Sequence, residues 1–243
     1  MWEKAKHNTT MITLPEDFEK RVKIQLGDEF DAFMASFDNG KISALRLDNG
    51  CDPESVFPGE LSPVDWCPTG FYYEEDLKPG SHPYHEAGVY YIQDASAMLP
   101  AEMLNPSLGE IVLDLCAAPG GKSTQLGKKL MGEGLLVSNE IIPSRAKILS
   151  ENIERMGITN CVVTNEAPED LSQKLPCFFD RILVDAPCSG EGMFRKNPDA
   201  MKEWSLENVK ICADRQDYIL DEAVKMCYNT LKYYPKSGEN CIL

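Results

Sequence analysis

The stretch from Val112 to Thr124 constrains the fold of this chain more than any other part of the sequence. It joins the apolar run Val112–Leu115 to a turn with two adjacent glycines, and then to a helix-forming sequence. Glycine has no Cβ, so Gly120 and Gly121 allow the backbone to approach a ligand closely. The following helix would direct its free N–H groups and the positive end of its dipole at the same place. The pattern predicts a strand, a turn and a helix that bind a cofactor, and therefore an enzyme.

The turn by itself leaves the identity of the cofactor open. A dinucleotide-binding turn would have the pattern G-x-G-x-x-G, which is absent here. A phosphate-binding P-loop needs a glycine five residues before the pair Gly121-Lys122, and Cys116 occupies that position. Glu140 follows a second apolar run, at the place where an acidic side chain binds ribose hydroxyls in Rossmann-like sheets. An adenosine-containing cofactor fits both features, and a surface carboxylate at a strand end is the alternative interpretation of Glu140.

The composition limits the class of protein. Hydrophobic residues make up 43% of the 243 residues, enough for a substantial core in one large domain or two smaller ones. No apolar stretch approaches the ~20 residues of a membrane span, and the first residues lack the apolar segment of a signal peptide. Nine cysteines without a C-x-x-C pair argue against a zinc site and predict reduced thiols in the cytoplasm. The net charge of −15 excludes a general polyanion-binding surface, so any nucleic-acid contact must be local.

The sequence pattern divides the chain into three parts. Residues 1–50 predict a small α+β domain, and residues 51–88, rich in Pro, Gly and aromatic side chains, predict an irregular connecting segment with a few short strands. From residue 89 to 243, strand and helix patterns alternate, which predicts an α/β, Rossmann-like domain with a mostly parallel sheet covered on both faces. The expected strands are 42–47, 110–115, 134–139, 160–164 and 180–185. A first helical pattern opens at Leu14 to Phe18 and is ended by Gly27. The other expected helices are 28–37, 94–103, 121–131, 143–157, 168–174 and 213–231.

A second loop carries reactive side chains. The apolar run 179–184 ends in Asp185 and continues through Pro187 and Cys188 to Gly190. The carboxyl ends of parallel strands meet at one edge of a sheet, so we expect this loop beside the glycine turn. A thiol there indicates covalent catalysis or proton handling, whereas a small buried apolar role is the commonest one for a free cysteine.

The residues after this loop allow two interpretations. Phe194, Arg195 and Lys196 place an aromatic side chain and two cations together in an acidic protein. They would either hold a nucleotide phosphate with Phe194 near a base, or form a solvated loop that packs Phe194 inward.

The two loops together resemble the SAM-dependent RNA cytosine-5 methyltransferases of the NOL1/NOP2/Sun family, in particular its bacterial RsmF-like branch. The resemblance covers nearly the whole chain. The motifs that carry it are Tyr90–Met98, Cys116–Lys122, Asp185–Gly190, Asp199, Trp204-Ser205 and Arg215-Gln216.

The resemblance implies SAM as cofactor and RNA, most of all rRNA, as substrate, with no metal and no membrane. Glu140 would bind the ribose hydroxyls, and Asp185 would lie between SAM and the target cytosine. Glu166, beside Asn165, occupies the place of the adenine-binding residue, although the Asp that is usual there is absent. The residues that would surround the methionine and ribose parts of SAM are Cys116, Ala117, Ala118, Pro119, Gly120, Gly121 and Lys122.

The resemblance also implies a mechanism with two cysteines. A thiolate adds to C6 of cytosine, C5 then attacks the methyl group, and a base removes the C5 proton so that the thiolate can leave. In the family one cysteine, in a Pro-Cys pair, assists product release, and Cys188 corresponds to it. The nucleophile lies in a Thr-Cys pair after the next core strand; here the sequence reaches Leu243 within that expected strand, and Cys241 lacks the Thr-Cys context.

We therefore expect a C-terminally truncated cytosine-5 methyltransferase that binds SAM and turns over poorly. The alternative is a non-catalytic RNA- or ribosome-binding module that retains SAM. An N-methyltransferase would carry an Asn/Asp-Pro-Pro-Tyr/Phe loop, which Asp185 to Cys188 replace.

Overall fold

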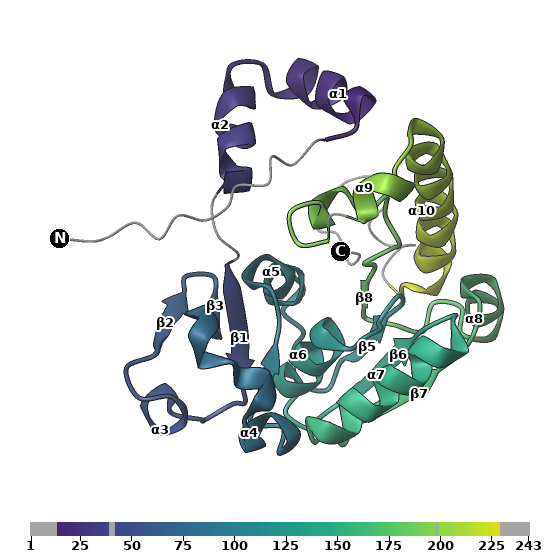
Figure 1. Cartoon of the computed structure of the whole chain (residues 1–243). Helices are drawn as coiled ribbons and strands as arrows, with labels where there is room; N and C mark the ends of the chain where they lie inside the picture. The colour runs from purple at the N-terminus through teal and green to yellow at the C-terminus, as the bar shows by residue number, and fades with distance from the viewer. Residues whose placement is uncertain (1–13, 39–41, 198, 229–243) are drawn as a thin grey trace. The chain divides into compact units, whose positions relative to one another are not determined.

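The structure is a computed structural model that describes residues 14–38, 42–197 and 199–228 (Figure 1). It contains two compact units. The first combines the N-terminal residues with the segment 188–215, and the second comprises residues 42–187 together with the chain from residue 216 onward. Within the described part of the chain, no helix is long and apolar enough to span a membrane.

The first unit is a small helical body with an aromatic core. Its helices are α1 (Glu16–Leu26), α2 (Phe30–Ala35), α9 (Ala200–Glu203) and the beginning of α10 (Leu206–Met226), with short 3-10 turns η1 (Gly27–Glu29), η2 (Ser36–Asp38) and η5 (Glu191–Met193). The ring of Phe18 lies 4.9 Å from that of Phe194 and 5.7 Å from that of Trp204. The two segments of this unit are therefore joined by a shared apolar core.

This core decides between the two interpretations of Phe194. Its side chain is 0% exposed, so the interpretation that places Phe194 near an RNA base is wrong and the inward-packing one holds. The neighbouring Arg195 donates a hydrogen bond to the carbonyl of Ser36, at 3.4 Å.

The second unit begins with an antiparallel sheet of strand order β2-β3-β1-β4. The strands are β1 (Ser43–Leu47), β2 (Leu61–Val64), β3 (Cys67–Tyr73) and β4 (Tyr90–Ile92), and the helices between them are α3 (Pro53–Val56), η3 (Glu75–Leu77), η4 (Pro79–Ser81) and α4 (Pro83–Glu86). All five residues of β1 are buried, because this strand has a neighbour on each side and packs on both faces.

The pairing of β1 bears on the predicted domains. The strand expected at 42–47 forms its hydrogen bonds with β3, which lies in the segment expected to be an irregular connection. The boundaries after residues 50 and 88 stay a prediction.

The parallel sheet predicted from residue 89 onward is confirmed, with strand order β7-β6-β5-β8. Its strands are β5 (Ile111–Asp114), β6 (Leu135–Asn139), β7 (Cys161–Thr164) and β8 (Arg181–Leu183), and its helices are α5 (Ala95–Leu104), α6 (Gly121–Lys129), α7 (Pro143–Arg155) and α8 (Pro168–Lys174). Side chains of α5, α6 and α7 pack on one face, and those of α8 and the later turns of α10 pack on the other. The consecutive residues Val112 and Leu113 of β5 enter these two different cores, because successive side chains of a strand point to opposite faces of the sheet.

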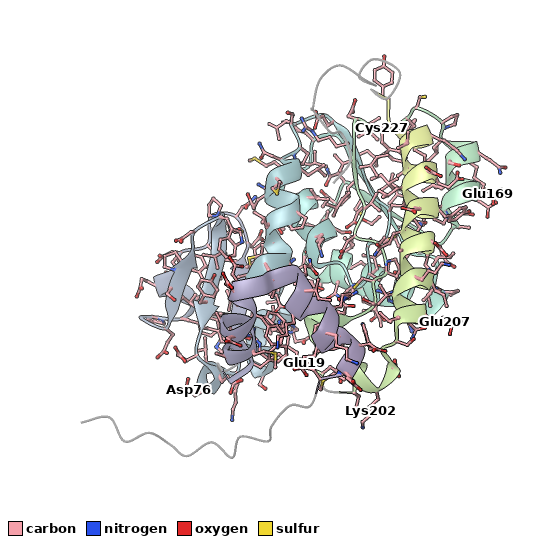
Figure 2. The ribbon with its side chains drawn as sticks, turned by 90° about the horizontal axis from the view of Figure 1, so that it is seen from above. Glu19, Asp76, Glu169, Lys202, Glu207 and Cys227 are labelled. Atoms are coloured by element: carbon pink, nitrogen blue, oxygen red, sulfur yellow. The ribbon has the colours of Figure 1, made fainter. Side chains whose placement is uncertain are left out.

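One predicted boundary is wrong. The helix expected at 213–231 begins at Leu206, and Figure 2 marks Glu207 near its start and Cys227 just past its end. Ser205 caps the helix, because its Oγ accepts a hydrogen bond from the N–H of Asn208 at 3.1 Å. The apolar periodicity misled the prediction, since Leu206 and Ile211 in the first turns are half exposed.

Candidate functional site

The glycine turn lies at the carboxyl end of β5 and begins α6. Gly120 has φ 114° and ψ 4°, a backbone conformation that residues with a Cβ rarely adopt. A Cβ at Gly120 would also lie 3.2 Å from Leu149 Cδ1, on α7. The turn therefore depends on glycine at this position for both conformation and space.

Side chains from two different directions hold the carbonyl groups of the turn. On one side, Arg145 and Asn152 of α7 donate to the carbonyls of Ala118 and Pro119, each at 2.9 Å. On the other side, Arg46 of β1 donates to the carbonyl of Gly121 at 3.1 Å. The antiparallel sheet thus helps to fix the same turn that the parallel sheet presents.

A buried polar network lies beneath the turn. Asp114, the last residue of β5, is 1% exposed, and its Oδ2 accepts a hydrogen bond from Ser123 Oγ at 2.7 Å. Ser138 of β6 donates in turn to Ser123, at 3.0 Å. Oδ1 of Asp114 is buried and has no hydrogen-bond partner among the described residues.

Burial raises the pKa of Asp114 from 3.8 to about 7. The hydrogen bond from Ser123 and the charge of Lys122 lower the pKa of this carboxyl, and the nearby carboxylates of Asp185 and Glu140 raise it further. Three acidic side chains therefore influence one another around this turn, and such a surrounding favours a ligand that carries positive charge.

Burial also raises the pKa of the Cys116 thiol, to about 12, and neighbouring carboxylates add to the effect. The thiol of Cys116 is therefore protonated at neutral pH. It can contact a ligand, but it is not a nucleophile.

Glu140 lies buried just past the end of β6. Its Oε1 accepts from the N–H of Ile142 at 3.0 Å, and its Oε2 lies 3.4 Å from Arg145. Asn165, which follows β7, donates to the backbone carbonyl of Glu140 at 2.6 Å. The carboxylate is thus oriented by α7 and the residue itself by the neighbouring strand.

Asn139 joins the ends of three strands, a role that the sequence did not predict. Its Nδ2 donates to the carbonyls of Leu115 and Glu166, at 3.3 and 3.0 Å. Its Oδ1 accepts from Thr164 Oγ1 and from the N–H of Glu166, at 2.8 and 3.1 Å. The only signal in the sequence is an amide side chain at the end of an apolar strand pattern, before Glu140.

The remaining predicted residues differ in their surroundings. Asp185, which follows β8, is exposed, and its Oδ2 lies 2.7 Å from Lys122 Nζ, so the two predicted loops meet through this pair. Glu166 is partly exposed and pairs with Lys174 of α8, at 2.8 Å. Cys188 is exposed and is the first residue of the 188–215 segment, which belongs to the other compact unit. Its assignment therefore stays a prediction.

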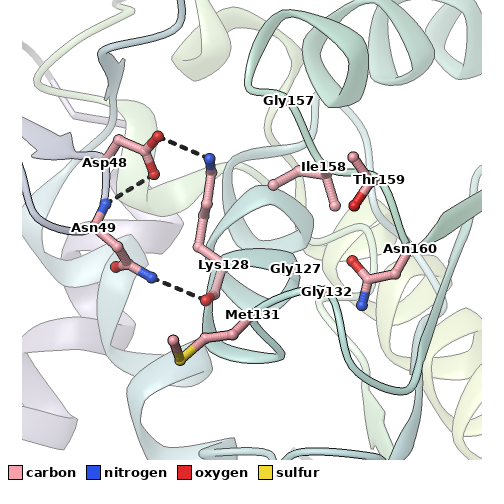
Figure 3. Close-up of a pocket in the computed structure, with 10 residues that line it drawn as sticks. All are labelled: Asp48, Asn49, Gly127, Lys128, Met131, Gly132, Gly157, Ile158, Thr159 and Asn160. Carbon is pink, nitrogen blue, oxygen red and sulfur yellow. Dashed lines mark hydrogen bonds and ion pairs between the residues drawn. The ribbon is translucent and has the colours of Figure 1, made fainter.

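A separate pocket of about 330 Å³ opens at the opposite edge of the parallel sheet (Figure 3). It is bordered by the residues that lead into β7 and by the end of α6. Lys128 pairs there with Asp48 at 2.8 Å, and Asn49 donates to the carbonyl of Lys128 at 2.9 Å.

Among the described residues, no group of three or more His, Cys, Asp or Glu side chains is arranged to hold a metal ion.

Comparison with known families gives two adjoining matches. Residues 101–233, more than half of the chain, match the family described as 16S rRNA methyltransferase RsmB/F. Residues 14–95 match the family described as the N-terminal domain of 16S rRNA methyltransferase RsmF.

Curated relatives carry a related name. The ribosomal RNA small subunit methyltransferase F of Vibrio cholerae is 45% identical over 226 residues, which cover 87% of this chain and 48% of the relative. The protein of the same name from Serratia proteamaculans is 45% identical over 168 residues, which cover 67% of this chain and 35% of the relative. The chain thus spans about half the length, or less, of these curated relatives.

Solved structures share the fold. A methyltransferase homolog protein from Pyrococcus horikoshii has a TM-score of 0.76 at 24% identity, over 90% of this chain and 72% of that one. The crystal structure of NSun6 from Pyrococcus horikoshii with SFG has a TM-score of 0.77 at 17% identity, over 89% and 81%. The predicted Rossmann-like methyltransferase fold is therefore confirmed.

Proposed function

Because the chain belongs to the 16S rRNA methyltransferase RsmB/F family, we propose that it binds SAM at the turn 116–122 and serves the methylation of cytosine C5 in rRNA. The observation that carries the proposal is the convergence of three strand ends. The glycine turn, the buried carboxylate of Glu140 and the pair of Lys122 with Asp185 all follow parallel strands of one sheet. An activity on rRNA would place the protein in the cytoplasm.

The side chains around the turn fit SAM. This cofactor carries a sulfonium and an ammonium group, both cationic, besides a carboxylate and ribose hydroxyls. The buried Oδ1 of Asp114 has no hydrogen-bond donor in the part of the chain that the structure describes, and Asp185 and Glu140 add negative charge nearby. Gly120 and Gly121 present backbone without a Cβ at the start of α6, where N–H groups favour a carboxylate.

Each residue then has a role of its own. The wall against the methionine and ribose parts of SAM is formed by Cys116, Ala117, Ala118, Pro119, Gly120, Gly121 and Lys122. Glu140 accepts hydrogen bonds from the ribose hydroxyls, as its fixed and buried position allows. Glu166 follows β7, where the adenine would lie, although its carboxylate is paired with Lys174. Asp185 is exposed and free to face the target base, while Lys122 orients it.

When bound, SAM supplies the electrophilic methyl group. The chain must activate cytosine, whose C5 is a poor nucleophile: a thiolate adds to C6, and a base later removes the C5 proton so that the thiolate is released. We assign the release step to Cys188. The nucleophile would lie in a Thr-Cys pair, which residues 1–243 do not contain, so we expect this stretch to bind SAM but to transfer methyl groups poorly by itself.

Calorimetric titration of residues 1–243 with SAM tests the binding part. We expect measurable binding, and Glu140→Gln should weaken it at least about tenfold because the amide no longer accepts both ribose hydroxyls. Glu133→Gln is the matched control, since Glu133 is exposed in the turn that precedes β6, away from the carboxyl end of the strand, and should leave the affinity unchanged. Absence of binding at millimolar SAM would refute the proposed cofactor.

Methyl transfer to small-subunit rRNA tests the reaction. A chain that includes a Thr-Cys pair after the next strand should produce 5-methylcytidine in nuclease-digested rRNA analysed by mass spectrometry, and residues 1–243 should produce far less. A methyl group on any other atom would refute the cytosine-5 chemistry. SAM binding with no transfer by either chain would support the non-catalytic RNA- or ribosome-binding alternative.

A further inference from the structure

Arg46 is a buried cation that none of the assigned roles uses. It lies in the centre of β1, between Gly70 of β3 and Tyr91 of β4, and is 1% exposed. Its NH2 group donates to the carbonyl of Gly121 at 3.1 Å and to Thr124 Oγ1 at 2.7 Å. No carboxylate of the described residues forms an ion pair with it.

A buried charge without an opposite charge destabilises a fold. Burial lowers the pKa of Arg46 to about 10, so the guanidinium nevertheless stays protonated at neutral pH. The nearest acidic side chains that influence it, Asp48 and Glu102, form their ion pairs with Lys128 and Lys129 instead. An apolar side chain of similar size would fill this position at lower cost, so stability alone does not explain the arginine.

The place of the charge suggests its use. Gly121 and Thr124 lie in the first turn of α6, whose free N–H groups and positive dipole end face the proposed ligand. A cation there is unfavourable for the helix itself, because it adds to the positive end of the dipole. The same arrangement favours a negatively charged ligand group at those N–H groups.

Neighbouring side chains fix both the arginine and the turn. Arg46 Nε donates to Gln93 Oε1 at 3.4 Å, and Gln93 Nε2 donates to the carbonyl of Ala97 at 3.0 Å. A Cβ at Gly121 would lie 3.2 Å from the Gln93 amide and 3.3 Å from the Tyr91 ring, so both side chains pack closely against the backbone of the turn. The start of α6 is thereby held at a defined position against the antiparallel sheet.

We propose that Arg46 is a positioning residue for the cofactor: it fixes the carbonyl of Gly121 and strengthens the binding of the carboxylate of SAM at the start of α6. This inference rests on the proposed function of the turn. It assigns to the antiparallel sheet a part in cofactor recognition, and it explains why the motif with Gln93 precedes the first strand of the parallel sheet.

Calorimetry with SAM and with decarboxylated SAM, which keeps the sulfonium and ammonium groups, tests the inference. The unaltered chain should prefer SAM, and Arg46→Met should lower the affinity for SAM about tenfold while changing that for decarboxylated SAM less than about twofold. Thermal unfolding without ligand should show an unchanged or higher Tm, because the variant removes a buried charge. A purely structural role would lower both affinities together.

Arg181→Met is the matched control. Arg181 donates to the carbonyl of Leu104 at 3.0 Å and pairs with Glu110, at the start of β8 on the opposite edge of the sheet. This variant should lower the Tm and leave the preference for SAM over decarboxylated SAM as it is in the unaltered chain.

Three outcomes overturn the inference. If Arg46→Met binds SAM as tightly as the unaltered chain does, the inference is refuted. If the variant loses the same affinity for SAM and for decarboxylated SAM, the inference is refuted as well. Both outcomes leave the proposed function intact. Failure of the unaltered chain to bind SAM refutes the inference and the proposed function together. If Arg46→Met does not fold, Arg46→Lys decides: a loss of about threefold or more for SAM alone supports the inference, and any other pattern refutes it.

Discussion

The two sides of the turn at 116–122 treat their ionisable groups differently. On the buried side, formed by Arg46, Gln93 and Asp114, the guanidinium and the carboxyl are each 1% exposed and form no ion pair among the described residues. On the open side, Arg145 lies 3.4 Å from Glu140, and Lys122 lies 2.7 Å from Asp185.

This difference separates stability from recognition. A charge that is buried without a partner destabilises the folded state, whereas on the open side each pair has one solvent-exposed member, Arg145 beside the buried Glu140 and Asp185 beside Lys122, so the charges there are compensated. The buried ionisable groups therefore lower the stability of the folded state without a structural benefit, and we infer that they contribute to ligand binding. Substitutions on the buried side should have the larger effects.

The largest effect is expected at Asp114. Its folded pKa of about 7 lies above its ordinary 3.8, so the folded state holds a proton that the unfolded state has lost between these values. The stability from this group is present below about pH 4 and is lost as the pH rises through about 7; at ~1.4 kcal/mol per pKa unit the loss is on the order of 4 kcal/mol. Asp114→Asn should remove this loss, measured as urea unfolding at pH 4 and pH 8.

If the free energy of unfolding changes with pH to the same extent in Asp114→Asn and in the unaltered chain, the prediction is contradicted. It would mean that the carboxyl is ionised in the folded protein throughout this range. The buried side would then hold two charges without ion-pair partners, Arg46 and Asp114, rather than one.

Substitution of the two glycines of the turn is expected to reverse the order of the two sides, with the larger loss of stability on the open side. Gly120 faces Leu149 on the open side, and Gly120→Ala should destabilise the chain by about 2–3 kcal/mol, because φ 114° strains any residue with a Cβ. Gly121→Ala, on the buried side, needs no left-handed backbone, but its Cβ would lie 3.2 Å from the Gln93 amide and 3.3 Å from the Tyr91 ring, so it should cost about 1 kcal/mol. Denaturant unfolding of both variants gives the order, and a larger loss at position 121 would reverse it.

The smallest effect is expected at Arg145. Its side chain is 44% exposed and lies 3.4 Å from the buried Glu140, which keeps its hydrogen bond from the N–H of Ile142, so Arg145→Met should change the free energy of unfolding by about 1 kcal/mol. Asn152→Ala, which removes the other α7 contact to the turn, is its companion. A loss above 2 kcal/mol in either variant would show that the open side supports the fold as strongly as the buried side.

The sequence predicted the parts of this site that depend on local pattern. Apolar runs followed by the glycine turn or by Asp185 identify the strands β5 and β8, whose carboxyl ends lie side by side in the sheet, because burial and turn formation depend on neighbouring residues. The start of α10 was misplaced, since its capping residue Ser205 precedes turns whose apolar side chains are exposed.

Roles that depend on distant residues left no local signal. The sequence pattern assigned no role to Arg46, because its partners come from residues 93 and 121 to 124. Asn139 similarly connects residues that lie before and after it in the chain, at the ends of three strands. Only the assembled sheets bring these groups together.

The first compact unit also has a consequence for synthesis on the ribosome. Phe18 packs on Phe194 and Trp204, which are added only after the whole of residues 42–187 has been translated. At about 5–20 residues per second, α1 leaves the ribosome on the order of ten seconds before its partners exist. During that interval the apolar face of α1 lacks these two partners, so α1 is translated well before its core can be completed.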